Sequence, residues 1–157
     1  MAFGRSDWPL TGEQLRHVIS LGETTLVELK QEWWDLASSE GKARLARQVI
    51  ALANTVGREE LGLIVFGIVD ARHGGGIRPV TSPPTEESVS QILAGYSAPP
   101  TNVQCRHHLL EEGLVSVLAV LHSEARRHHA TREHPGVLSP RDAYVRRDKQ
   151  VGFLTSQ

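Results

Sequence analysis

The sequence predicts a mixed α/β fold, of the α+β kind, in which helices pack on a mixed sheet. Segments with the 3.6-residue period of an amphipathic helix are interleaved with strand-length segments between Thr11 and Tyr96. The longest apolar run, Leu61 to Val69, is continuous, which is typical of a central strand covered on both faces. A hairpin pattern follows late in the chain. Together these patterns favour a sheet that contains both parallel and antiparallel strands.

Three helices are expected, each with its own start and stop signals. The first begins with a capping box at Thr11 and ends at Gly22. The second is capped by Ser38 or Ser39, and its apolar stripe ends at Gly57. The third is capped by Thr85, carries two acids in its positive first turn, and ends before Pro99.

Five strands are expected around these helices. An alternating pattern from Thr25 places Val27 and Leu29 on one face and Glu28 and Lys30 on the other, as in a half-buried strand. The central strand is the apolar run, and Glu111-Glu112-Gly113 connects the two strands of the hairpin. The expected ranges are 61–69 for the central strand, 103–110 and 114–121 for the hairpin, and 143–147 for the last strand.

Length and composition limit the class of protein. The 157 residues suit one compact domain, in which a helical segment, 1–21, precedes the main unit, 22–157. No segment resembles a signal peptide or a membrane span, so we expect a soluble, cytoplasmic protein with no membrane partner. The lone Cys105 excludes an internal disulfide and a multi-cysteine zinc site.

Charge is unevenly distributed along the chain, although the formal net charge is only −1. Residues 1–103 carry nine Lys and Arg against twelve acids, whereas residues 104–157 carry eight against six, together with six of the eight histidines. The C-terminal third is therefore the candidate anion-facing side. Because aromatic residues are few, contacts to phosphates are a better expectation than base stacking.

Three carboxylates, Glu23, Glu28 and Asp70, flank the first expected strand and the end of the central one. If they meet, their repulsion is relieved by a hard cation such as Mg²⁺ or Mn²⁺, which organises phosphoryl-transfer chemistry. Spacing alone favours a simpler interpretation: Glu23 caps a turn, Glu28 lies on a solvated strand face, and Asp70 opens the glycine-rich loop 71–76.

Four short segments occur in an order and spacing that resemble the Schlafen AlbA-type domain. They are 22–30 (GETTLVELK), 51–55 (ALANT), 66–70 (FGIVD) and 143–147 (AYVRR). The resemblance extends from about Gly22 to Arg147 and implies a single-domain bacterial member with a compact α/β fold. Nuclease members of that family cleave transfer or ribosomal RNA with three acids and a divalent ion. Those acids match Glu23, Glu28 and Asp70, which would be both the catalytic residues and the ligands of Mg²⁺ or Mn²⁺.

The sequence departs from the family pattern in three respects. A longer, charged segment, Val56 to Glu60, stands where a Gly-Gly turn usually follows Asn54-Thr55. The structural zinc of vertebrate members is not carried over, because its cysteines are missing here. Vertebrate members also fuse two lobes into a cradle for RNA, whereas this chain supplies one, so a homodimer is the simplest substitute.

Strand geometry sets a condition on the acid site. Along a regular strand, Glu23 and Glu28 would lie roughly 16 Å apart and on opposite faces, too far to share one ion. The metal interpretation therefore requires a corner at residues 22–25, for which Gly22 and the Thr24-Thr25 pair are suited.

The candidate substrate-binding residues are basic. Lys30 follows Glu28 on the same strand face and could hold a phosphate, or it could be an ordinary surface lysine. Arginines that could contact the RNA backbone, or simply lie on the surface, are Arg126, Arg127, Arg132, Arg146 and Arg147.

The histidines carry a weaker signal. Adjacent His107 and His108 point to opposite faces of a strand, so we assign them to structure or surface. The roles of His128, His129 and His134, which follow in an expected loop, stay open.

Three functions are therefore compared. The first is a metal-dependent endoribonuclease acting on structured RNA such as transfer RNA, in stress response or phage defence. The second is a non-catalytic regulatory module that binds nucleic acid or a nucleotide, in which binding survives loss of the acids. The third is an oligomerisation domain cut from a larger protein.

Overall fold

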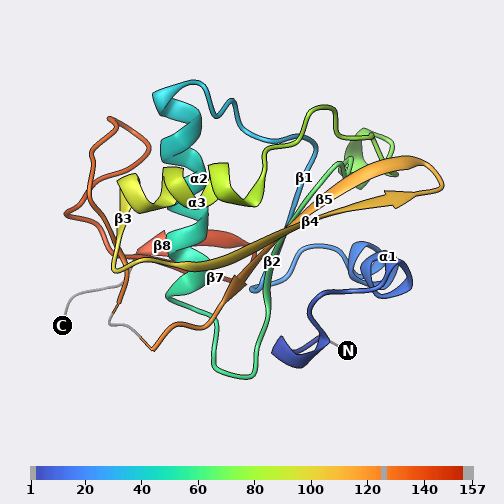
Figure 1. Ribbon diagram of the computed structural model, residues 1–157, viewed down its shortest axis with the longest axis horizontal. Coiled ribbons are helices and arrows are strands. Elements are labelled where there is room, and N and C mark those ends of the chain that lie inside the picture. The colour runs from blue at the N-terminus through green and yellow to red at the C-terminus, as the bar shows by residue number, and fades with distance from the viewer. Residues whose placement is uncertain (1–2, 125–126, 154–157) are drawn as a thin grey trace.

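The computed structural model describes residues 3–124 and 127–153 and is built around a four-stranded sheet of order β1-β2-β5-β4 (Figure 1). The strands β1 and β2 are parallel, and the other two neighbouring pairs are antiparallel. This is the mixed sheet that the sequence predicts. The strands are β1 (Val27–Lys30), β2 (Gly62–Phe66), β4 (Asn102–Leu110) and β5 (Gly113–Leu121).

The strand β2 is buried along its whole length because it faces a core on each side. Ile64 and Phe66 point into a core shared with α2 (Ser39–Ala53) and α3 (Glu86–Tyr96). Leu63 and Val65 point into a second core that includes residues of α1 (Gly12–Leu21). The period of two along a strand thus explains why this segment is continuously apolar.

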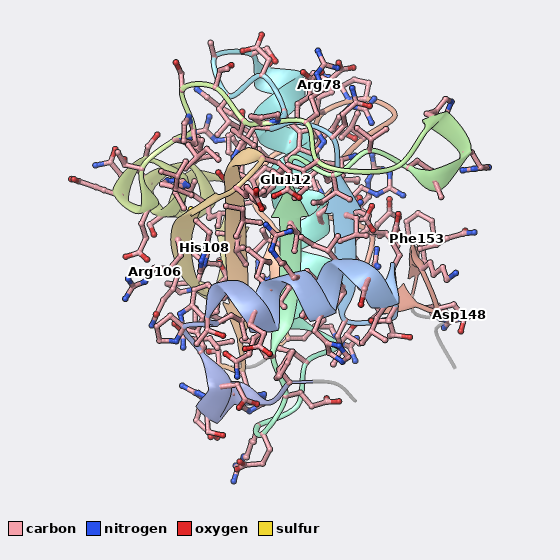
Figure 2. All side chains as sticks on the ribbon, turned by 90° about the vertical axis from the view of Figure 1, so that its right-hand side faces the viewer. Arg78, Arg106, His108, Glu112, Asp148 and Phe153 are labelled. Carbon is pink, nitrogen blue, oxygen red and sulfur yellow. The ribbon has the colours of Figure 1, made fainter. Side chains whose placement is uncertain are left out.

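Helices cover both faces of the sheet. Figure 2 shows α1 crossing one face, and Figure 1 shows α2 and α3 on the other. Their starts follow from capping: Thr11, Ser38 and Thr85 each accept a hydrogen bond from a backbone N–H three residues ahead. These are the caps expected from the sequence. None of the described helices is long and apolar enough to cross a membrane.

Smaller elements complete the fold. The hairpin β7 (Tyr144–Arg147) and β8 (Gln150–Phe153) packs beside α2, and β3 (Ser97–Ala98) pairs with β6 (His129–Ala130). The described residues also include the 3-10 turns η1 (Arg5–Asp7) and η2 (Ala71–His73).

The structure differs from the sequence prediction mainly at element ends. The helix α2 ends at Ala53 rather than Gly57, because Asn54 caps it and turns its side chain to other segments. The strand β2 ends at Phe66, since Gly67 adopts a φ of +107°. The strands β3, β6 and β8 were not expected, since two have only two residues and the third has only four, one of them a glycine.

Candidate functional site

A tight turn at the start of β1 brings two of the three acids together. Thr24 and Val27 form a β-bridge, with backbone N–H···O distances of 3.0 and 3.3 Å in the two directions. The chain therefore reverses at residues 22–25, as the metal interpretation required, and Gly22 supports the approach with a φ of +78°. In this register Glu23 lies directly across from Glu28, and cross-strand neighbours point to the same side.

The two carboxyl groups interact strongly. Partial burial raises the pKa of Glu23, and the neighbouring Glu28, which lies within hydrogen-bonding reach, raises it further. Arg146 and Lys30 act in the opposite direction, though less strongly. Glu28 itself is largely enclosed, with only 12% of its side chain exposed. The simpler interpretation, in which Glu28 lies on a solvated face, therefore does not fit its position.

Arg146 lies beneath this acid pair and not on the surface. Its guanidinium donates to Oε2 of Glu28 at 2.6 Å and to the backbone carbonyls of Thr24, Thr25 and Val27. Only 1% of the side chain is exposed. Arg146 was expected to contact substrate from the surface; its described contacts instead fix the turn and hold Glu28. Its neighbour Arg147 points the other way and is exposed.

The segment Asn54-Thr55 explains how Arg146 reaches this position. The Asn54 amide donates to the carbonyls of His128 and Tyr144 at 3.0 and 2.9 Å, which ties β7 to the end of α2. The Thr55 hydroxyl accepts from the backbone N–H of Arg146 at 2.8 Å. Both residues belong to segments on which the Schlafen resemblance rests, and their role here is to position β7.

Asp70 is held away from a three-acid arrangement. It caps η2, accepts from the Arg72 backbone N–H at 2.8 Å, and pairs with the Arg72 guanidinium at 3.3 Å. These bonds lower the pKa of Asp70. The pKa of Arg72 is raised mainly by Asp70 and to a smaller extent by the negative charge of Glu23. Among residues 3–124 and 127–153, no group of three or more His, Cys, Asp or Glu side chains could hold a metal ion.

The Glu23–Glu28 pair nonetheless fits part of a site for Mg²⁺ or Mn²⁺. Carboxylate oxygens are the ligands that these ions prefer, and such ions keep several waters, so two protein ligands can suffice. A cation would also relieve the repulsion that raises the pKa of Glu23. Asp70 could contribute only after separating from Arg72.

The other basic candidates are spread over the surface. Lys30 shares the side of β1 with Glu28, and its amino group lies 5.2 Å from the centre of the Trp34 ring. Arg127 is exposed, and Arg132 lies over the ring of Tyr96 in α3. Arg126 lies outside the described residues. The structure thus brings Lys30, and neither Arg127 nor Arg132, to the acid pair.

A pocket that was not predicted from the sequence adjoins Glu28. Its volume is about 280 Å³, and β1, α2 and the β7–β8 hairpin line it. Basic residues in its wall include Arg44 and Arg47 of α2 and Lys149 of the β7–β8 turn. The spacing of Arg44 and Arg47 on the polar face of α2 was a signal available from the sequence. The place of Lys149 in the pocket wall could not be seen in the sequence, because it depends on how the β7–β8 hairpin packs against α2.

Two of the candidate histidines, His107 and His128, form hydrogen bonds that connect separate segments of the fold. His107 bonds to the Ser116 hydroxyl and the Pro84 carbonyl. Buried His128 bonds to the Pro99 carbonyl at 2.6 Å. The assignment of His107 to structure agrees with these contacts.

Two solved structures share this fold. The DIP2311 protein from Corynebacterium diphtheriae is 14% identical with a TM-score of 0.57, and the match covers 90% of this chain and 30% of that one. The N-terminal domain of a putative ATP-dependent DNA helicase RecG-related protein from Nitrosomonas europaea is 15% identical with a TM-score of 0.53, covering 92% and 93%. The chain thus spans under a third of the first protein. No curated protein matches the sequence.

The family described as Schlafen, AlbA_2 matches residues 23–153. This range includes the acid pair, Asp70, the Asn54-Thr55 segment and both strands of the β7–β8 hairpin. The residues that build the site are therefore those that the family model covers, and the chain belongs to the Schlafen AlbA_2 family.

Proposed function

We propose that this protein is a divalent-metal-dependent endoribonuclease that cleaves structured RNA such as transfer RNA. The observation that carries the proposal is the Glu23–Glu28 pair, held side by side on Arg146 next to a basic pocket. The nucleic-acid link draws further support from the family and from the helicase-related name of the structural neighbour.

In this proposal Glu23 and Glu28 hold Mg²⁺ or Mn²⁺, and Asp70 joins them when it releases Arg72. When bound, such an ion polarises the scissile phosphate and activates a water. Arg146 orients Glu28 through its hydrogen bond of 2.6 Å. Lys30, on the same side of β1, is placed to contact a phosphate oxygen. A homodimer would supply a second lobe to clamp a folded RNA.

The alternative is a non-catalytic module that binds nucleic acid or a nucleotide. The engagement of Asp70 by Arg72 favours it, because the third acid does not lie with the other two among the described residues. On this alternative, binding depends on the basic residues and survives the loss of the acids.

Incubation of the protein with total transfer RNA and Mn²⁺ or Mg²⁺, beside an EDTA control, tests the proposal. We expect discrete fragments that disappear with EDTA, in Glu23→Gln and in Asp70→Asn. These variants are chosen because Glu28→Gln would leave the buried Arg146 without its partner and could fail to fold.

A matched control removes two exposed carboxylates elsewhere, in Glu59→Gln/Glu111→Gln, and should cleave as the wild type does. Cleavage that persists in Glu23→Gln would contradict the proposed role of the acids. Retained, salt-sensitive binding without cleavage would favour the binding module.

A further inference from the structure

We infer that the pocket between α2 and the β7–β8 hairpin is a phosphate-binding subsite, in which Arg44, Arg47 and Lys149 hold a phosphate group of a nucleic acid or nucleotide. The inference deepens the proposed function and rests on it for the identity of the substrate class. None of these three residues was among the candidates that the sequence indicated.

The charges lining the pocket are unbalanced. Of its basic residues, only Arg146 has a buried acidic partner, Glu28. Arg44 has a loose, exposed contact with Glu40 at 3.6 Å. Within the described part of the chain, Lys30, Arg47 and Lys149 form no salt bridge. Several cations gathered around one hollow without compensating acids attract an anion, and guanidinium groups suit phosphate geometry.

Arg47 is held in place before any ligand binds. Its guanidinium lies 5.5 Å from the centre of the Tyr144 ring and 5.9 Å from that of Phe153, and it donates to the Val137 carbonyl at 3.3 Å. These contacts leave other donors of its five N–H groups available. A preorganised side chain loses less conformational entropy on binding, which favours a specific site over diffuse surface attraction.

The wall of the pocket also contains an unsatisfied polar atom. The amide oxygen of Gln48 is buried and lacks a hydrogen-bond partner within the described residues. Buried polar atoms are nearly always paired, so Gln48 is an exception among the residues of the pocket wall. A change of its rotamer would present this acceptor to a ligand donor such as a ribose hydroxyl.

The position of the pocket connects it to the acid pair. Glu28 and Lys30 contribute to its lining from β1. A phosphate held in the pocket therefore lies next to the strand that carries Glu28, one of the proposed catalytic residues. The pocket volume of about 280 Å³ is close to the lower limit of ligand pockets, roughly 300 Å³, and suits one phosphate with its sugar. The pocket therefore suits the anchoring of a phosphate next to the one to be cut.

Binding of a 3′-fluorescein 12-nucleotide RNA in EDTA, measured by fluorescence anisotropy, tests the inference without cleavage. The RNA is used with a 5′-phosphate and with a 5′-hydroxyl. The variant Arg44→Ala/Lys149→Ala removes two exposed side chains, and Arg58→Ala/Arg106→Ala removes the same charge elsewhere. Figure 2 shows Arg106 on the opposite side of the molecule from Asp148, the neighbour of Lys149.

We expect Arg44→Ala/Lys149→Ala to weaken binding at least about tenfold and to reduce the slope of log affinity against log salt by roughly 0.7, the value for one neutralised phosphate of a single strand. The control should stay within about twofold of the wild type. If the wild type prefers the RNA with a 5′-phosphate and Arg44→Ala/Lys149→Ala loses that preference, the ligand is a terminal phosphate monoester. Equal weakening of both RNAs identifies an internal phosphodiester.

Affinity in Arg44→Ala/Lys149→Ala equal to that of the control would overturn the subsite, as would a wild type that binds neither RNA. The cleavage assay separates the two proposals. Cleavage with no effect of the pocket variant rejects the subsite alone, whereas pocket-dependent binding without any cleavage rejects the nuclease alone.

Discussion

The ionised carboxylate of Glu23 lowers the stability of the folded protein at neutral pH. Folding partly buries its carboxyl group and places it beside Glu28, so its pKa is higher in the folded chain than in the unfolded chain. The folded state therefore binds this proton more tightly. The resulting stability is fully present below the ordinary carboxyl pKa, about 4.3, and is lost as the pH rises through the raised value.

We therefore expect Glu23→Gln to be more stable than the wild type at pH 7 to 8, with a difference that shrinks towards pH 4. Urea unfolding at a series of pH values measures this. Glu59→Gln, which removes an exposed carboxylate, should show no such trend. A gain that is independent of pH, or larger in acid, would show that burial and the neighbouring Glu28 do not raise the pKa of Glu23.

Arg146, unlike Glu23, stabilises the fold, because its buried guanidinium pairs with Glu28 and donates hydrogen bonds to three backbone carbonyls. Arg146→Met should cost about 3–5 kcal/mol, because it leaves the carboxylate of Glu28 without a partner and frees three backbone carbonyls. Arg147→Met, on the exposed side of the same strand, should stay within about 0.5 kcal/mol of the wild type.

Chemical denaturation gives both values. The double variant Glu28→Gln/Arg146→Met should recover part of the loss, because it removes the unpaired charge. Equal, small effects of Arg146→Met and Arg147→Met would contradict the burial of Arg146.

At the scale of elements, the start of α2 depends on a glycine. Gly41 is buried in the first turn, where an added Cβ would collide with the Asp35 carbonyl oxygen. The turn from Asp35 to Ser38 cannot withdraw easily, since Ser38 and Ala37 both donate hydrogen bonds to Asp35. This turn fixes the position from which α2 presents Arg44 and Arg47.

Gly41→Ala should therefore destabilise the protein by about 1–3 kcal/mol, the usual cost of overpacking. Gly95→Ala is the matched control, because Gly95 lies inside α3 and its added Cβ would have only an ordinary contact at 3.6 Å. That control should gain roughly 0.5–1 kcal/mol, the usual difference between Gly and Ala in a helix. Thermal unfolding of both variants checks the opposite signs, and a Gly41→Ala variant as stable as Gly95→Ala would contradict the packing.

The elements also show what local sequence can reveal. Thr11, Ser38 and Thr85 were identified as caps because a cap depends on only a few neighbouring residues. The end of α2 was misplaced because Asn54 bonds to segments 74 and 90 residues away. The requirement for a corner at residues 22–25 came from the geometry of strands, and the Thr24–Val27 bridge confirms it.

For the whole molecule, the candidate site is a product of tertiary structure. The turn at Thr24 sets Glu23 beside Glu28, but Arg146 reaches them only because Asn54 and Thr55 hold β7. Similarly, Arg44 and Lys149 are over 100 residues apart in the sequence and meet around one pocket. The resemblance to the Schlafen family identified the acids as a candidate site, whereas the burial of Arg146 and the basic pocket could not be predicted from residue types and spacing.

Titration of Mn²⁺ into the metal-free protein at pH 7, followed by calorimetry, tests the central claim most directly. We predict that the wild type and Glu59→Gln/Glu111→Gln bind the ion equally and that Glu23→Gln, its fold verified by circular dichroism, binds at least about tenfold more weakly. Equal affinity in Glu23→Gln, or no binding by the wild type, would contradict the assignment of Glu23 and Glu28 as a metal site.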